Sequence, residues 1–127
     1  MNLLIDTHVL LWWLSAPERI TQRAANSLHT PENRVYVSAA VAWEIAIKSN
    51  LGKLQAEKVL SDLPRILFDR GFLRLAISVD HALRAGVLPR HHNDPFDRML
   101  VAQAQALNCP IISADARFDS YGVRRIW

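Results

Sequence analysis

Short apolar runs alternate with longer segments of helical periodicity along this chain of 127 residues. Each apolar run is too short for a helix and ends at polar or turn-forming residues, which is typical of a buried strand. The predicted strands cover residues 1–5, 34–37, 72–75, 110–113 and 123–127, the last at an edge. The predicted helices cover residues 9–14, 17–28, 39–48, 57–70, 78–85 and 95–107. This alternation predicts an α/β fold, with a mostly parallel central sheet flanked by helices in three layers.

Composition predicts a single globular domain over residues 1–127. Half of the residues are hydrophobic and 21% are charged, which excludes a disordered chain. No apolar run approaches the length of a membrane span, and no basic segment precedes the first run. We therefore expect a soluble cytoplasmic protein without a membrane partner. The single cysteine, Cys109, excludes an internal disulfide and a multi-cysteine zinc site.

The charge balance is modestly basic. The formal net charge is +3, and twelve of the fifteen basic residues are arginine, whose guanidinium group pairs with phosphate through two hydrogen bonds. If several acids gather at one site, the rest of the surface is more basic than the net charge indicates. The composition is therefore compatible with a polyanionic partner but does not require one.

Asp97 occupies an unusual place in the predicted helix over residues 95–107. Asp94 and Pro95 are typical of a helix N-cap and first position. The helix dipole favours an acid near the N-terminus, but it does not explain an acid on the core-facing side. At 3.6 residues per turn, Asp97 shares that side with Leu100, Val101, Ala104 and Leu107, whereas Arg98, Gln103 and Gln105 lie off it. Asp97 is therefore a candidate functional residue.

Glu44 is the only polar residue between Val41 and Ile47 in the predicted helix that Ser38 caps. An ionised Glu on an apolar face is costly unless it is paired or bound to a cation. An exposed pair with Lys48 one turn later would contribute only about 0.3–0.5 kcal/mol. We therefore favour a functional role for Glu44 over this surface pair.

Four carboxylates are expected at one edge of the sheet, where the strands end and ligands bind. Asp6 and Asp115 each follow a predicted strand, and the helices that carry Glu44 and Asp97 bring both acids to the same edge. Without a matching basic cluster these acids repel one another, unless a hard divalent cation joins them. Oxygen ligands favour Mg²⁺ or Mn²⁺. Asp119 is an alternative to Asp115, although its surroundings indicate a surface turn.

Several segments carry a resemblance to a known family, in the family's order. They are Leu4-Ile5-Asp6-Thr7-His8, Ser38, Trp43-Glu44-Ile45-Ala46-Ile47-Lys48, Leu51-Gly52-Lys53-Leu54, His92 with Asp94-Pro95-Phe96-Asp97-Arg98, and Ser113-Ala114-Asp115. Over essentially its whole length the chain resembles the PIN-domain toxins of the VapC family. The resemblance implies an Mg²⁺-dependent endoribonuclease that is paired with an antitoxin and is usually homodimeric. It also implies that the four acids of the site are Asp6, Glu44, Asp97 and Asp115, with Asp115 the least firmly fixed.

Under this interpretation each acid has an expected role. Mg²⁺ would be held chiefly by Asp6 and Asp97 and would lower the pKa of the attacking water. Glu44 and Asp115 would bind a second ion or position that water.

Four further residues are candidates for substrate binding. For Thr7 the alternative is capping the helix that follows, and for Arg98 it is a surface salt bridge. Lys48 is a third candidate, and His92 is expected to hydrogen-bond its own loop and to touch the substrate. A zinc site at His91 and His92 is disfavoured, because no further His or Cys lies near them at ligand spacing.

Two other functions compete with the nuclease. A phosphotransfer or phosphatase-type domain would use Asp6 as nucleophile, but it would need a second acid beside it or two residues later, and the sequence continues Thr7-His8. A non-catalytic binding module of the same fold would tolerate loss of the acids, yet all four are present. We therefore expect the nuclease.

Overall fold

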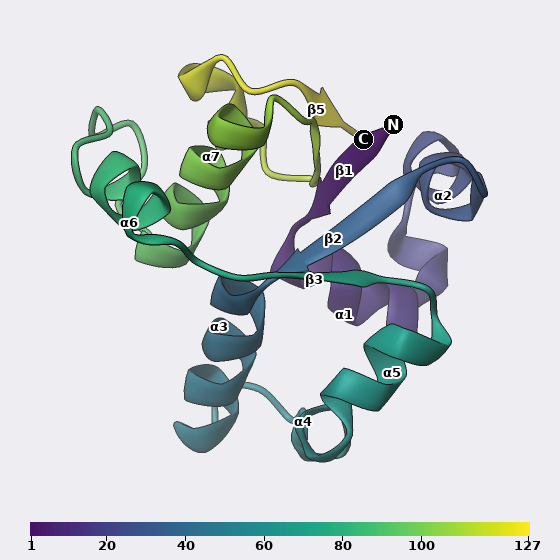
Figure 1. The fold of residues 1–127 in the computed structure, drawn as a ribbon. Helices are drawn as coiled ribbons and strands as arrows, with labels where there is room; N and C mark the ends of the chain where they lie inside the picture. The colour runs from purple at the N-terminus through teal and green to yellow at the C-terminus, as the bar shows by residue number, and fades with distance from the viewer.

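Five strands form one sheet in the computed structural model, which describes residues 1–127 (Figure 1). They are β1 (Asn2–Ile5), β2 (Arg34–Ser38), β3 (Leu73–Leu75), β4 (Ile111–Ile112) and β5 (Arg125–Ile126), in the order β3-β2-β1-β4-β5. Every neighbouring pair is parallel. The predicted parallel sheet is therefore confirmed, with β5 at an edge, and all five strands end at the same side.

Helices cover both faces of this sheet. They are α1 (Thr7–Ser15), α2 (Gln22–His29), α3 (Ala39–Asn50), α4 (Glu57–Ser61), α5 (Leu63–Asp69), α6 (Val79–Gly86) and α7 (Pro95–Leu107), with short 3₁₀ segments η1 (Pro17–Arg19) and η2 (Ala116–Tyr121). Helices α6 and α7 lie on one face, and α1, α2 and α5 lie on the other (Figure 1). This arrangement is the predicted three-layer α/β/α fold. None of the helices is both long and apolar enough to span a membrane.

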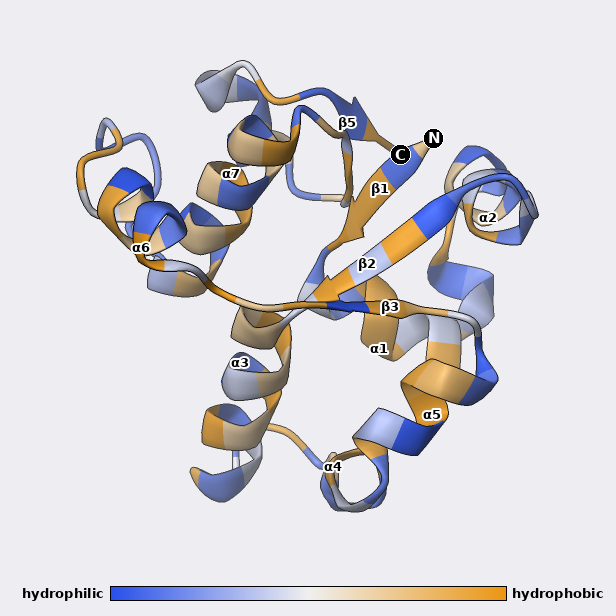
Figure 2. Cartoon of the chain, viewed as in Figure 1, coloured by the Kyte–Doolittle hydropathy of each residue, from blue (hydrophilic) through white to orange (hydrophobic).

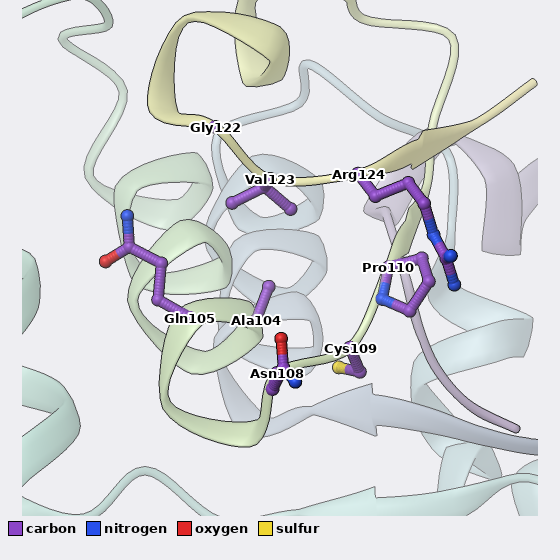
Figure 3. Close-up of a pocket in the computed structure, with 8 residues that line it drawn as sticks. All are labelled: Ala104, Gln105, Asn108, Cys109, Pro110, Gly122, Val123 and Arg124. Carbon is purple, nitrogen blue, oxygen red and sulfur yellow. The ribbon is translucent and has the colours of Figure 1, made fainter.

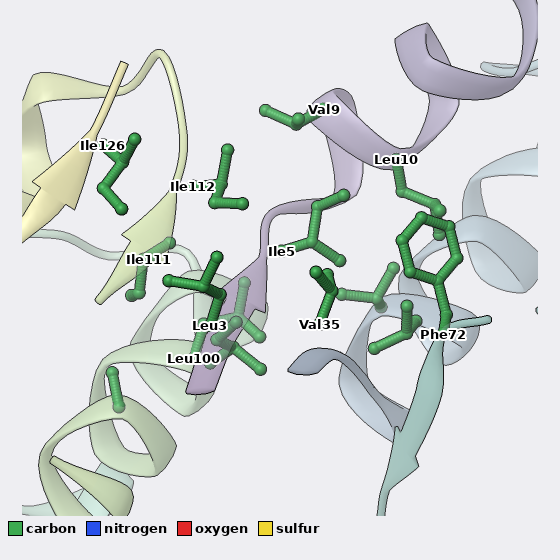
Figure 4. Packing of buried hydrophobic residues seen from close by; sticks show 14 of the residues in the cluster. Leu3, Ile5, Val9, Leu10, Val35, Phe72, Leu100, Ile111, Ile112 and Ile126 are labelled. Carbon is green, nitrogen blue, oxygen red and sulfur yellow. The ribbon is translucent and has the colours of Figure 1, made fainter. Parts of the chain in front are cut away.

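The strands β1 and β4 lie in the centre of the core. Side chains of neighbouring strands pack together between Leu100 of α7 and Leu10 of α1 (Figure 4). Colouring by hydropathy shows the same pattern, since β1 is largely hydrophobic while the outer faces of the helices carry polar residues (Figure 2). Each fully buried Leu or Ile contributes about 1.5–3 kcal/mol relative to an exposed one. The core therefore fixes the strand ends from which the site is built.

Two predicted helices differ from the observed ones. The single kinked helix expected over residues 57–70 is instead two helices, α4 and α5, which are separated at Asp62. Pro64 lacks an N–H to continue the first helix, but it is well suited to the first turn of a new one. The helix expected over residues 17–28 begins later, at Gln22, because Thr21 caps it by accepting a hydrogen bond from the Ala24 N–H.

The helix α7 begins as predicted, but its buried face is wider than expected. The Asp94 carboxylate accepts hydrogen bonds from the N–H groups of Phe96 and Asp97. Gln103, which was placed off the core-facing side, is completely buried, and Leu107 is 40% exposed. Gln103 is buried because α6 packs along α7 and covers a face that periodicity alone assigns to solvent.

Candidate active site

Asp6 and Asp115 are joined through one serine at the carboxyl ends of β1 and β4. Asp6 is only 4% exposed, and its Oδ2 accepts a hydrogen bond of 2.7 Å from the Ser113 hydroxyl. The same hydroxyl oxygen accepts the Asp115 N–H at 3.0 Å. Burial raises the pKa of Asp6, while the Ser113 bond opposes that shift. Ser113 therefore fixes the position of both acids.

Glu44 lies on the inner side of α3 and is 2% exposed. Its Oε1 accepts a hydrogen bond of 2.5 Å from the Thr7 hydroxyl, and its Oε2 contacts the Lys48 ammonium one turn later. Thr7 thus hydrogen-bonds a carboxylate, and its side chain does not cap α1. The pair with Lys48 is formed, but it is partly buried at the site and is not the exposed surface pair considered above.

Asp97 shows most clearly that the four acids share one site. Its side chain is 14% exposed, and its pKa is raised from 3.8 to about 8. Burial is the largest cause, followed by the negative charges of Asp6, Asp94, Glu44 and Asp115. Carboxylates that repel one another in this way must lie close together in a poorly solvated place.

Asp115, rather than Asp119, completes the acid cluster. Asp115 Oδ1 and Oδ2 accept hydrogen bonds of 2.8–3.1 Å from the Arg117 guanidinium, whose proximity lowers the pKa of Asp115. Asp119 is exposed and pairs with Arg125 at 2.9 Å. The expectation that no basic groups accompany the acids is wrong, because Lys48, Arg117 and the imidazole of His92 all contact them.

His92 projects into the cluster from the loop before α7. Its Nδ1 accepts the Asp94 N–H at 3.1 Å, as expected for a residue that bonds its own loop, so a neutral ring carries its proton on Nε2. Nε2 lies 2.8 Å from Asp97 Oδ2 and 3.6 Å from Asp115 Oδ2. The alignment with Asp97 is poor, and this buried N–H has no hydrogen-bond acceptor.

This tautomer also decides against zinc. Ligand atoms of His92, Asp97 and Asp115 lie within 4.8 Å of one another, but a protonated Nε2 donates and does not ligate. The ring of His91 packs instead against Tyr121, with 5.1 Å between centroids. The geometry therefore presents His92 as a hydrogen-bond donor beside the carboxylates.

Arg98 and Tyr121 hold the loop that carries His92. The Arg98 guanidinium donates to the carbonyls of Ala85, Leu88, Pro89 and His92 at 2.9–3.3 Å, so it does not form the surface ion pair considered for it. The Tyr121 hydroxyl donates to the Pro89 carbonyl at 2.7 Å and accepts the His92 N–H at 2.9 Å. Both residues position His92.

Three residues of this site were not identified from the sequence. Arg117 lies only two residues after Asp115, so its pairing had a local signal. Ser113 is the last residue of a predicted strand, but its partner Asp6 lies 107 residues away. Tyr121 lies 29 residues from His92, and nothing local links the two.

The residues present fit a hard divalent cation. Asp6 and Asp97 offer carboxylate oxygens, which such ions prefer, and no Lys or Arg pairs with either of them. Burial and neighbouring carboxylates raise the pKa of both acids, so a bound cation would stabilise their charged forms. The unpartnered Nε2–H of His92 next to them suits an oxygen atom of a bound phosphate or water.

A cavity at the other edge of the sheet does not belong to this site. It has a volume of about 510 Å³ and lies where the end of α7 meets the segment before β5 (Figure 3). Pro110 lines it at the start of β4, which is the opposite edge of the sheet from Asp6 and Asp115. Its lining contains no Asp, Glu or His, so it offers none of the groups described above.

Comparisons with known proteins identify the family of the chain. A family model for the PIN domain matches residues 3–123. Ribonuclease VapC22 of Mycobacterium tuberculosis is 31% identical over 124 residues, which span 94% of this chain and 92% of that protein.

Two solved structures, both under 25% identical to this chain, show the same fold. One is VapBC2 from Rickettsia felis bound to a DNA fragment from their promoter, with 14% identity, a TM-score of 0.73 and complete coverage of both chains. The other is VapBC-1 from nontypeable Haemophilus influenzae, with 17% identity, a TM-score of 0.70, and coverage of 98% of this chain and 96% of that one. From the family model and the curated relative, the chain belongs to the PIN-domain family and, within it, to the VapC proteins.

Proposed function

We propose that this protein is an Mg²⁺-dependent endoribonuclease and the toxin of a type II toxin–antitoxin pair. The observation that carries the proposal is the clustering of Asp6, Glu44, Asp97 and Asp115: burial, followed by the charges of neighbouring acids that include the other three, raises the pKa of Asp97 to about 8. The name of its relative, Ribonuclease VapC22, supports the reaction class. The neighbours named VapBC support a protein antitoxin as partner.

Asp6 and Asp97 would hold Mg²⁺, with Mn²⁺ as a substitute. When bound, the ion supplies Lewis-acid stabilisation of a phosphodiester and a water of lowered pKa. Thr7 and Lys48 orient Glu44, and Arg117 orients Asp115, so both acids are placed to position that water. His92 presents its Nε2–H to an oxygen of the bound phosphodiester. A substitution that displaces Glu44, Asp115 or His92 should weaken cleavage while the fold stays intact.

The phosphotransfer alternative is less well supported. A nucleophilic aspartate must be reachable by a phosphoryl donor, whereas Asp6 is 4% exposed and its Oδ2 accepts the Ser113 hydroxyl. From the family we also propose an RNA substrate and a homodimer.

Cleavage of labelled cellular RNA by the purified protein tests the proposal. We expect cleavage with Mg²⁺, none with excess chelator, and none by Asp97→Asn with Mg²⁺. Asp69→Asn is the matched control, because it removes an equal charge from an exposed pair with Arg65. Expression of wild type, but not of Asp97→Asn, should also arrest growth. Cleavage that survives chelation, or that Asp97→Asn retains in full, would exclude the proposed mechanism.

A further inference from the structure

A groove of about 280 Å³ adjoins the acid cluster on its Glu44 side. It runs between α1 and the turn that follows α3. Its lining consists of Thr7, His8, Leu11, Glu44, Lys48, Lys53 and Leu54. Thr7 and Glu44 are also part of the acid site, so one end of the groove opens directly onto that site.

Lys53 lines this groove, and its ammonium group has no partner within the protein. Gly52 has a φ of 72°, which lets the chain reverse after α3, and the Lys53 N–H donates to the Lys48 carbonyl at 2.9 Å. This backbone contact brings Lys53 close to Lys48 in space. Lys and Arg ion pairs of the protein involve Lys48, Arg65, Arg117 and Arg125. Lys53 is exposed and has no acidic partner.

His8 and Lys48 add donors to the same groove. His8 is exposed, and its imidazole has an N–H donor whether it is neutral or charged. One N–H of the Lys48 ammonium is used by Glu44, which leaves two others. Burial would lower the pKa of Lys48, but Glu44, Asp94 and Asp97 raise it overall, so Lys48 stays cationic. The groove therefore carries positive groups directly beside a negative site.

The remaining walls are apolar. Leu11 and Leu54 are both half-buried and line the same groove. A surface that combines cations with apolar walls suits a nucleic-acid strand, whose phosphates are charged and whose bases are not. An isolated anion would be repelled by the neighbouring carboxylates. A strand with repeated phosphates can instead place one at a cation bound to the acids and the next in the groove.

We propose that this groove binds a backbone phosphate of single-stranded RNA, one next to the phosphodiester that is cleaved, through Lys53, His8 and the free N–H groups of Lys48. This inference rests on the proposed nuclease function and adds the side from which the substrate strand enters. It also gives a role to Lys53, which pairs with none of the four acids.

Binding of a short fluorescein-labelled single-stranded RNA of mixed sequence, measured by anisotropy with Ca²⁺ in place of Mg²⁺, tests the groove with a hard cation at the acids, and a gel checks that the RNA stays intact. We expect Lys53→Glu to weaken binding on the order of tenfold, the effect of losing one charged hydrogen bond. The slope of log affinity against log salt should fall by about 0.7 for each lost phosphate contact. Lys58→Glu is the matched control, since Lys58 is an exposed lysine on α4 outside the groove. Lys53→Arg should bind like wild type, and His8→Ala should weaken binding less than Lys53→Glu.

Cleavage kinetics separate this inference from the proposed function. With Mg²⁺, Lys53→Glu should raise KM while kcat at saturating RNA stays near that of wild type. If Lys53→Glu and Lys58→Glu weaken binding equally, only the net charge of the protein affects RNA binding, and the groove proposal fails. Unchanged RNA binding in every groove variant would also overturn the proposal and would indicate a protein ligand for the groove instead. A wild type that binds through Lys53 but never cleaves would instead refute the nuclease proposal and leave the groove standing.

Discussion

The acid cluster has an unpaired part, called inner, and a part paired with Lys or Arg, called outer. These names refer to pairing and not to burial, since Glu44 is 2% exposed and the Asp97 side chain 14%. The inner acids, Asp6 and Asp97, have no Lys or Arg partner, and burial is the largest cause of their raised pKa values. The outer acids, Glu44 and Asp115, are each paired with a cation, Lys48 and Arg117. Arg117 lowers the pKa of Asp115. Charge is therefore left uncompensated only in the inner part.

This difference indicates different tasks. An uncompensated pair of buried carboxylates is costly in the empty protein and gains most from a bound cation. A paired carboxylate is already stabilised and is held in one orientation by its partner. We infer that the inner acids are the main metal ligands and that the outer acids are positioning groups. The predictions below test that division.

Substitution of an inner acid should have the largest effect on cleavage. Asp6→Asn should lower kcat/KM on the order of 10³-fold, because the several kcal/mol that a bound metal contributes are lost. Asp115→Asn should lower it only about 10–100-fold, as for groups that orient metal ligands. Initial rates with RNA over a range of Mg²⁺ concentrations measure both. Excess Mg²⁺ should not rescue Asp6→Asn. Equal losses in the two variants would contradict the division.

Stability without metal should also separate the two parts, with opposite dependence on pH. The folded-state pKa of Asp97 is about 8 against an ordinary 3.8. The folded state therefore binds more protons between these values, and the free energy of unfolding in chelator should fall as pH rises from 4 to 8. The pKa of Asp115 is lowered, so its contribution is instead lost as pH falls below its ordinary value.

Melting curves in chelator at pH 8 test this directly. Asp97→Asn should melt higher than wild type, whereas Asp115→Asn should melt slightly lower, because it loses the pair with Arg117. Mg²⁺ should stabilise wild type by about 2.7 kcal/mol at a hundredfold excess over its dissociation constant, and Asp97→Asn by less. If Asp97→Asn melts lower than wild type and Mg²⁺ shifts both equally, Asp97 only stabilises the start of α7.

The predictable parts of this site are those encoded locally. The apolar runs predict the strands that Asp6 and Asp115 follow, and the periodicity of α7 places Asp97 toward the core. The inner and outer division was not predictable, because it depends on which cations reach the acids after folding. Ser113 meets Asp6 from 107 residues away, and the burial of Gln103 depends on the position of α6. Periodicity describes one face of one element, whereas these contacts depend on several elements at once.

His92 lies between the two parts, and its support should have the smallest effect on cleavage. Tyr121→Phe removes the hydroxyl that donates to the Pro89 carbonyl and accepts the His92 N–H. Each net hydrogen bond contributes about 1 kcal/mol, so a loop that holds His92 less firmly should lower kcat by about tenfold or less. Because Tyr121 touches neither inner acid, the Mg²⁺ dependence of cleavage should stay that of wild type.

A matched hydroxyl deletion shows whether this effect is specific. Tyr36 in β2 is half-buried and its hydroxyl forms no hydrogen bond within the protein, so Tyr36→Phe should retain the kcat of wild type. An equal fall in both variants would mean a general loss of stability, and an unchanged kcat in Tyr121→Phe would mean that His92 needs no such support. A fall in kcat with an altered Mg²⁺ dependence would place His92 with Asp97 in the inner part. The expected fall without that change places it with Asp115, because both then act by positioning and neither by holding the metal.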